Sequence, residues 1–118
     1  MASSPVTLPS LTIPNGSDVS NWLTSTGDYG DAVGLAIYAP ASLDAHTYVI
    51  ECAPISGSPI SVFQQGDSGA TADCTPPGAG KARVYYDLPA LGMIRIKDQS
   101  GNVAAAREFK VAKLISLP

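Results

Sequence analysis

Two consecutive stretches, VGLAIYAP at residues 33–40 and HTYVIECAP at residues 46–54, decide the fold class of this chain. In both, large side chains fill every second position and a proline ends the run. This repeat is typical of a β-strand with one face toward a core, because successive side chains of a strand point to opposite faces. The residues expected to point inward are Val33, Leu35 and Ile37 in the first stretch and Tyr48, Ile50 and Cys52 in the second.

The same alternation recurs along the chain at nearly regular spacing. Further strands are predicted over residues 18–24, 58–65, 81–87, 92–98 and 103–115. Their expected inward residues are Ile60, Val62, Ala82, Val84, Tyr86, Ile94, Ile96, Phe109 and Val111. Turn-forming residues separate the strands, and QSGN at 99–102 predicts a hairpin loop. We therefore predict an all-β fold, an antiparallel β-sandwich or jelly-roll-like barrel of about eight short strands.

The N-terminal residues 1–17 differ from the rest because three prolines interrupt them. Proline has no backbone N–H to donate to a sheet, so this segment is predicted to be an extended N-terminal arm or an edge strand. The expected organisation is an arm at 1–17 followed by a single β-sandwich domain at 18–118. The apolar residues of such an arm are candidates for contact with another surface: Val6, Leu8, Leu11 and Ile13.

Charged residues are distributed unevenly along the 118 residues. Residues 1–80 contain seven acidic residues and no Lys or Arg, whereas all seven basic residues lie within 81–113. Two interpretations are open. Acidic loops pair with basic strands inside one fold, or a basic face of one copy meets an acidic face of the next. The basic residues expected to project together from adjacent strands are Lys81, Arg83, Arg95 and Lys97.

The composition limits the classes of partner. Only 14% of the residues are charged and 45% are hydrophobic, which favours burial of part of the surface against other proteins. A net charge of −3 argues against nucleic acid as a partner, because phosphate contacts need clustered positive charge. No apolar run approaches the length of a membrane span, and the first residues lack the regions of a secretory signal. We expect no membrane partner and no export by a signal peptide.

Two short motifs resemble loops with chemical roles, and both are interpreted as turns. GDSG at residues 66–69 sets Ser68 in the context of a nucleophilic serine. The one histidine, His46, precedes it closely in sequence, and the chain is too short for the two barrels of chymotrypsin-like proteases. GAGK at residues 78–81 lacks the first glycine and the final Ser or Thr of a phosphate-binding loop. No catalytic residue and no enzymatic activity are predicted.

Metal and cofactor sites are not predicted either. GDYGD at residues 27–31 supplies two carboxylates, a poor start for calcium, which takes six or more oxygen ligands. Cys52 and Cys74 are too few for a zinc site. In the absence of an export signal they are expected to be reduced and partly buried.

The only tryptophan, Trp22, has two interpretations. With Tyr29 and Tyr38 it could form a flat platform on which a sugar ring stacks. A lone tryptophan in a β-sandwich lies more often in the core or at an interface, so Trp22 is a candidate interaction residue together with the basic residues.

Two longer segments resemble small β-rich virion proteins of tailed bacteriophages. GDAVGLAIYAPASLDAHTYVIECAP at residues 30–54 combines an acidic glycine turn, an alternating strand, an Ala-Pro-Ala turn and a second strand. LGMIRIKDQSGNVAAAREFKV at residues 91–111 is similar to the closing element of that group, with Arg95 in one strand and Phe109 in the next. Together the two segments cover about two-fifths of the chain.

This resemblance implies a structural role in a virion. Such proteins decorate the capsid as cement proteins, or form the bases of head fibres and parts of tails, and they assemble in the host cytoplasm. It implies a homo-oligomer, a trimer in preference to a dimer, that binds the major capsid protein or another virion protein. No cofactor and no catalytic residue come with it. The alternative function is a carbohydrate-binding β-module on a host-facing fibre or tail component.

Overall fold

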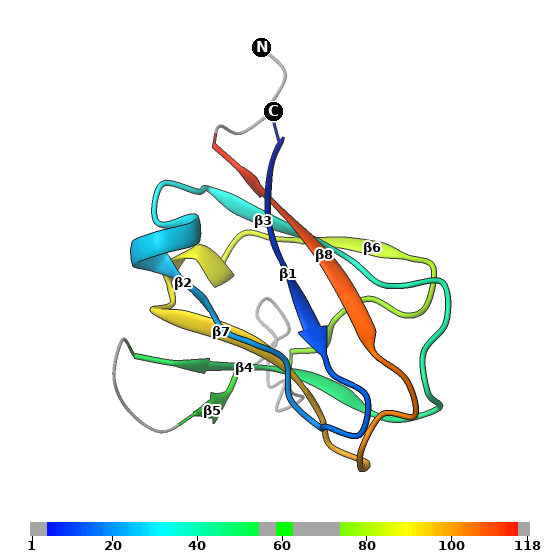
Figure 1. Cartoon of the computed structure of the whole chain (residues 1–118). Helices are drawn as coiled ribbons and strands as arrows, with labels where there is room; N and C mark the ends of the chain where they lie inside the picture. The colour runs from blue at the N-terminus through cyan, green and yellow to red at the C-terminus, as the bar shows by residue number, and fades with distance from the viewer. Residues whose placement is uncertain (1–4, 55–58, 63–73, 116–118) are drawn as a thin grey trace, which may run out of the picture.

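The computed structural model describes residues 5–54, 59–62 and 74–115, which form two antiparallel sheets packed against each other (Figure 1). Sheet A has the strand order β1-β8-β3-β6, and sheet B has the order β2-β7-β4-β5. The predicted all-β sandwich is therefore confirmed. The strands are β1 (Pro5–Ile13), β2 (Leu23–Thr24), β3 (Gly34–Tyr38), β4 (Tyr48–Ala53), β5 (Ile60–Ser61), β6 (Ala82–Tyr85), β7 (Met93–Asp98) and β8 (Arg107–Leu114).

Two short helical segments, Ser25–Tyr29 and Leu88–Ala90, complete the regular structure of the described residues. Neither is long and apolar enough to cross a membrane. The first is capped by Thr24, whose hydroxyl accepts a hydrogen bond from the amide of Gly27. It carries Tyr29 into the core, where the phenol donates a hydrogen bond to the carbonyl of Leu91.

The core fills the space between the sheets with the alternating residues that the sequence predicts. Phe109 and Val111 of β8 are 0% and 1% exposed, and Ile94 and Ile96 of β7 are both 0% exposed. The same core contains most of the inward residues expected of the strands around residues 33–40 and 46–54: Leu35, Ile37, Tyr48, Ile50 and Cys52. Val33 is the exception, since it precedes β3 and is exposed.

The first residues of the structure form a strand of the sandwich and not a separate arm. Figure 1 shows β1 beside β8, and the register runs from the pair of Pro5 with Leu114 to the pair of Ile13 with Arg107. A shift in register between Leu8 and Leu11 lets both of these side chains face the core, although their spacing is odd. Residues 5–13 therefore belong to the domain assigned to 18–118, as the edge-strand interpretation predicts.

Two strands present different residues to the core from those expected. In β6, Tyr85 is buried, whereas Val84 and Tyr86 are 42% and 55% exposed, so the predicted inward set is inverted. The hydroxyl of Tyr85 donates to the carbonyl of Thr75, which holds this residue on the inner side. In β5, Ile60 pairs with the inward-facing Cys52 but is 61% exposed, because this two-residue edge strand extends beyond the core.

The loop at residues 99–102 is not the turn of a hairpin. It joins β7 of sheet B to β8 of sheet A, so the chain crosses between the sheets here. β7 pairs instead with β4, which precedes it by some forty residues, and β8 pairs with β1 and β3. The prediction of a hairpin is wrong here because two alternating strands joined by a short polar loop can either pair with each other or belong to different sheets. The local sequence is the same in both cases.

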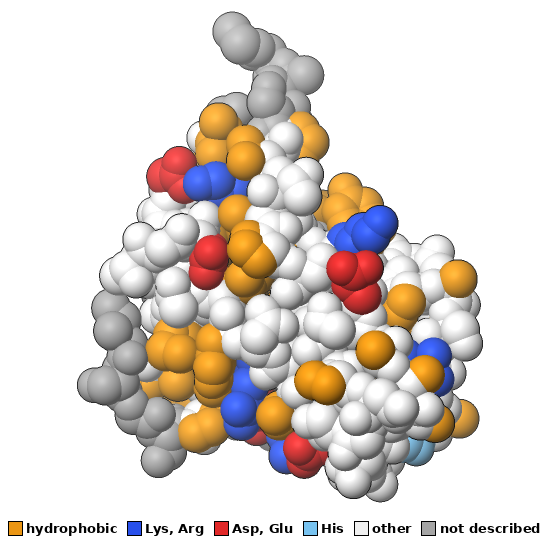
Figure 2. All heavy atoms as spheres, in the orientation of Figure 1, with side chains coloured by type: hydrophobic (Ala, Val, Ile, Leu, Met, Phe, Trp, Pro, Cys, Tyr) orange, Lys and Arg blue, Asp and Glu red, His pale blue; other side chains and the backbone are white. Residues whose placement is uncertain are grey.

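Ion pairs join the acidic half of the chain to the basic half within the fold. Figure 2 shows basic side chains lying next to acidic ones on the face in view. Each pair takes its acid from residues 1–80 and its base from 81–113, which supports the first of the two interpretations of the charge distribution. The pairs are Asp18 with Lys97, Asp31 with Lys113, Asp44 with Arg107 and Glu51 with Arg95.

These contacts predict a loss of stability in acid. Hydrogen bonds from Lys97 and Lys113 lower the pKa of Asp18 and Asp31, and the amide of Ala104 with Arg107 lowers the pKa of Asp44. A carboxyl group whose pKa is lower in the folded state stabilises the fold above its unfolded pKa, near 4, and this contribution disappears as the pH falls through the folded pKa. The urea midpoint should therefore hold from pH 7 to about pH 5 and fall below about pH 4.

Asp44→Asn tests this assignment. The variant should be less stable than the parent at pH 7 and should lose less of its remaining stability between pH 5 and pH 3. Glu108→Gln is the control, since Glu108 is exposed and makes no ion pair with the described residues. Equal acid sensitivity of the parent and Asp44→Asn would show that this carboxyl does not contribute.

Candidate interaction surface

The outer face of sheet A is apolar over three successive rows of residues. Paired residues of an antiparallel sheet point to the same face, so the strand registers define each row across the sheet. The first row is Pro5, Leu114 and Gly34, beside the ring of Tyr86; the second is Thr7, Ala112, Ala36 and Val84; the third is Lys110, Tyr38 and Ala82. One side chain in these rows is charged.

The shape of this surface, the sheet A outer face, is a floor of small residues beside larger ones. A Cβ atom added to Gly34 would lie 3.1 Å from the ring of Tyr86, so the glycine leaves room for this aromatic ring to lie close to β3. Tyr38 is 45% exposed, and a hollow of about 330 Å³ opens beside it near Lys110. A solvated face of an antiparallel sheet normally carries polar residues, and an exposed apolar face marks an interaction surface.

The outer face of sheet B is closed by its own side chains. The guanidinium of Arg95 lies 4.4 Å from the centre of the Trp22 ring and donates to Glu51 at 2.8 Å. Lys97 donates to Asp18 at 3.1 Å. These charged side chains are already paired, so this face offers less for a partner than the sheet A outer face.

The predicted interaction residues do not form one surface. Leu8, Leu11 and Ile13 are buried in the core, and Val6 at the end of β1 is 40% exposed. The physical reason is that the proline-punctuated segment pairs with β8 and directs its apolar side chains between the sheets.

The predicted basic stripe is wrong. Arg83 lies in β6 of sheet A, with its guanidinium 5.2 Å from the centre of the Tyr85 ring. Arg95 and Lys97 lie in β7 of sheet B and are held in ion pairs. The basic residues thus occupy two different sheets.

The sugar-stacking platform, the less favoured of the two interpretations of Trp22, is not assembled. Tyr29 is 0% exposed in the core, Tyr38 lies on the outer face of sheet A, and Trp22 packs beside β7 of sheet B. The three rings therefore share no surface. Trp22 is partly buried beneath Arg95, which agrees with its interpretation as a packed residue.

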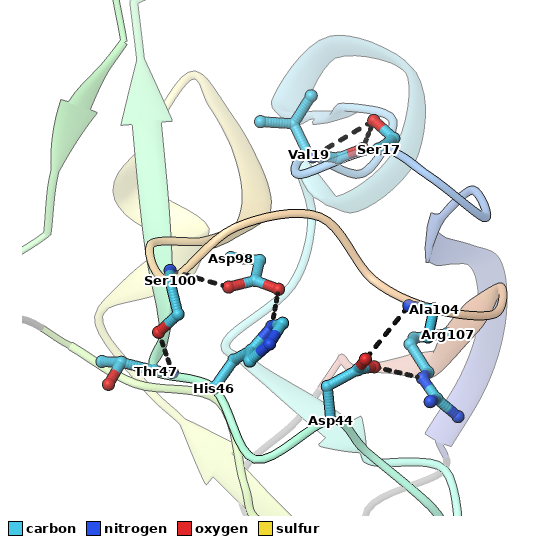
Figure 3. A network of polar contacts seen from close by, with 9 residues as sticks. All are labelled: Ser17, Val19, Asp44, His46, Thr47, Asp98, Ser100, Ala104 and Arg107. Atoms are coloured by element: carbon cyan, nitrogen blue, oxygen red, sulfur yellow. Dashed lines mark hydrogen bonds and ion pairs between the residues drawn. The ribbon is translucent and has the colours of Figure 1, made fainter.

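A polar network that contains His46 lies where the chain enters β4 and leaves β7 (Figure 3). Its Nδ1 lies 2.5 Å from Oδ2 of Asp98, a carboxylate that is fully buried. The other oxygen of Asp98 accepts from the amide of Ser100, whose hydroxyl accepts from the amide of Thr47. A carboxylate only accepts, so His46 donates from Nδ1, and the network ties the start of β4 to the end of β7. The histidine is thus hydrogen-bonded next to the start of a strand.

Among the described residues, no hydrogen bond joins a hydroxyl or a thiol to His46. A cleft of about 480 Å³ borders it, lined by Tyr48, Pro76 and Pro77 among others. The Tyr48 hydroxyl has no hydrogen-bond partner among the described residues, and burial raises its pKa, which favours the protonated phenol.

The remaining candidate sites lie partly within the residues that the structure describes. Residues 78–81 form a turn closed by a hydrogen bond from the amide of Lys81 to the carbonyl of Gly78. Burial raises the pKa of the Cys52 and Cys74 thiols, both of which lie in the core. No three His, Cys, Asp or Glu side chains come together as a metal site in the described parts of the chain. GDSG at 66–69 lies outside the described residues.

The buried Asp98 predicts a strong dependence of stability on this network. Asp98→Ala removes the acceptor of both His46 and the Ser100 amide, and should lower the free energy of unfolding by about 2–4 kcal/mol. Urea denaturation of Asp98→Ala, His46→Ala and the double variant measures the coupling, which should be about 1 kcal/mol or more. Additive single-variant losses would mean that the two side chains do not stabilise each other.

Comparison with protein families, with curated proteins and with solved structures finds no match to this chain. The functional argument therefore depends on the sequence and on the geometry described above.

Proposed function

We propose that this chain is a structural protein of a tailed-phage virion, a capsid decoration protein that binds neighbouring capsid subunits through the sheet A outer face. The virion setting comes from the resemblance of residues 30–54 and 91–111 to small phage virion proteins. The apolar outer face of sheet A supports the choice of docking surface, in place of the N-terminal arm that the sequence suggested.

The single observation that carries the proposal is the apolar outer face of sheet A. Gly34, Ala36 and Ala112 allow another protein surface to approach the sheet closely, while Tyr38 and Tyr86 supply large side chains with one polar end each. Tyrosine is enriched among the residues that contribute most to binding at protein interfaces. A shallow surface of this kind suits a flat protein partner better than a small ligand, which needs an enclosing pocket.

The size of the surface fits an assembly with many copies. Four strands and three rows of side chains cover roughly 400 Å², about half of what each partner contributes to a standard interface. One such contact is weak by itself. Repetition over a capsid lattice raises the overall affinity through multivalency, which is how a small decoration protein is retained.

Substitutions in the centre of the face test the docking surface. Ala36→Glu places a charge in the middle row, and Tyr38→Ser removes an exposed ring, so each should weaken binding to particles of the encoding virus at least tenfold. Binding is measured by co-sedimentation of the purified protein with intact particles, and folding by thermal denaturation. Both variants should fold, because the register places both side chains on the outer side of the sheet, and the larger loss of stability is expected for Ala36→Glu, since Ala36 is 5% exposed and Tyr38 is 45% exposed.

Gln99→Glu is the matched control, because it adds the same charge at an exposed residue that directly follows β7 of sheet B. It should bind particles as the parent does. If Ala36→Glu co-sediments as well as Gln99→Glu, the sheet A outer face is not the docking surface. If the parent itself does not bind particles, the decoration function is wrong.

A further inference from the structure

The two edges of sheet A differ in how they are protected. At one edge, β1 carries Pro5 and Pro9, and the side chain of Asn21 accepts from the amide of Thr12 and donates to the carbonyl of Ser10. Prolines and side-chain hydrogen bonds of this kind prevent an edge from pairing with another strand. At the other edge, β6 has no such protection among the described residues, and its sequence, Ala-Arg-Val-Tyr, contains no proline.

The backbone of β6 presents unused hydrogen-bonding groups on that edge. The carbonyl of Lys81 accepts from the amide of Ala39, which fixes the residues of β6 that bond to β3. Because bonded pairs alternate along an antiparallel ladder, Arg83 and Tyr85 also bond to β3. The N–H and C=O groups of Ala82 and Val84 therefore point away from the sheet.

The sequence around β6 is complementary to itself when two copies pair antiparallel with Val84 at the centre. Val84 then faces Val84 of the second copy, with both exchanging hydrogen bonds. The small Ala82 faces the large Tyr86, and Arg83 faces Tyr85, an aromatic ring that a guanidinium already covers.

The charges at the ends of this pairing are also complementary. Lys81 of one copy meets Asp87 of the other, and the two-fold symmetry makes this contact twice. Neither residue forms an ion pair within the described part of the chain. Most of the other described charges in sheets A and B are already paired, so Lys81 and Asp87 are available for a partner.

Other registers fit less well. A two-fold centred on Arg83 places Arg83 against its own copy, and like charges directly opposite each other are destabilising. A two-fold axis centred on Tyr85 would require Leu88 and Pro89 to pair as extended strand residues, but both lie in the helical segment Leu88–Ala90. The centre at Val84 uses only the extended residues and those directly beside them.

From these observations we infer that the partner of β6 is a second copy of this chain, paired antiparallel through β6 with Val84 on the two-fold axis. The two A sheets then form one continuous eight-stranded sheet. This inference deepens the proposed function by naming one partner, and it gives a two-fold dimer where the resemblance implies a trimer. The joined outer faces cover roughly 800 Å², the size that each partner contributes to a standard interface.

Val84→Pro is the sharpest test of the pairing. It removes the N–H that points toward the second copy and leaves the bonds between β6 and β3 in place, as is usual for proline on an edge strand. Sedimentation equilibrium should show a dimer for the parent and at least a tenfold higher dissociation constant for Val84→Pro. Val84→Thr is the matched control, because it keeps both the N–H and the branched shape, and it should dimerise as the parent does.

Charge reversal tests the register without a change in the strand. Lys81→Glu and Asp87→Lys should each weaken the dimer at least tenfold, and the double variant should restore it to near the parent value. Lys110→Glu makes the same charge change on the outer face, away from the edge, and should not affect dimerisation. If the double variant is no better than the single ones, the pairing centred on Val84 is wrong.

The outcomes separate this inference from the proposed function. A parent chain that is monomeric at all concentrations, or a dimer that Val84→Pro leaves intact, contradicts the β6 pairing even if particles are bound. A dimer sensitive to Val84→Pro that fails to bind particles supports the pairing and contradicts the decoration function. Should Val84→Pro fail to fold, the charge reversals decide the question alone.

Discussion

The pairing of β8 with β1 on one side and with β3 on the other is the contact on which the rest of the structure depends. It joins the two ends of the described chain, from Pro5 with Leu114 to Ile13 with Arg107. Because β8 is bonded along both edges, its alternate residues must serve two surfaces at once. Phe109 and Val111 fill the core, while Ala112 and Leu114 face outward. The apolar character of both faces gives the molecule its core and its candidate interaction surface.

The charge distribution follows from the same architecture. The basic residues of β7 and β8 form ion pairs with acidic residues from loops and strands earlier in the chain. This pairing uses most of the few charges on the described surface. Lys81, Asp87 and Lys110 are among those that remain, and these three lie on or beside sheet A. The surface is thus left with an apolar face bordered by a small number of unpaired charges.

The sequence predicts the elements of this fold well where one of the two sets of alternate residues in a strand is clearly more apolar than the other. Ile94 and Ile96 against Arg95 and Lys97 is such a case, and the prediction is confirmed. In β6 both phases carry aromatic or branched residues, so alternation alone cannot choose between Val84 and Tyr85 for the core. The burial of β1 and the crossing from β7 to β8 depend on pairing between distant segments, which local patterns do not specify.

Sequence patterns do not predict the candidate interaction surface, for a related reason. Gly34, Ala36 and Tyr38 are the outward-facing residues of β3, and its inward-facing residues carry large aliphatic side chains. The weakly polar character of the outward-facing residues is visible in the sequence. Its meaning required the neighbouring strands, since only the register places Ala112 and Val84 beside them. The most direct test is a cryo-electron microscopy map of the particle with this protein bound. The account predicts that the sheet A outer face lies against a capsid subunit, and a map in which that face is open to solvent would contradict it.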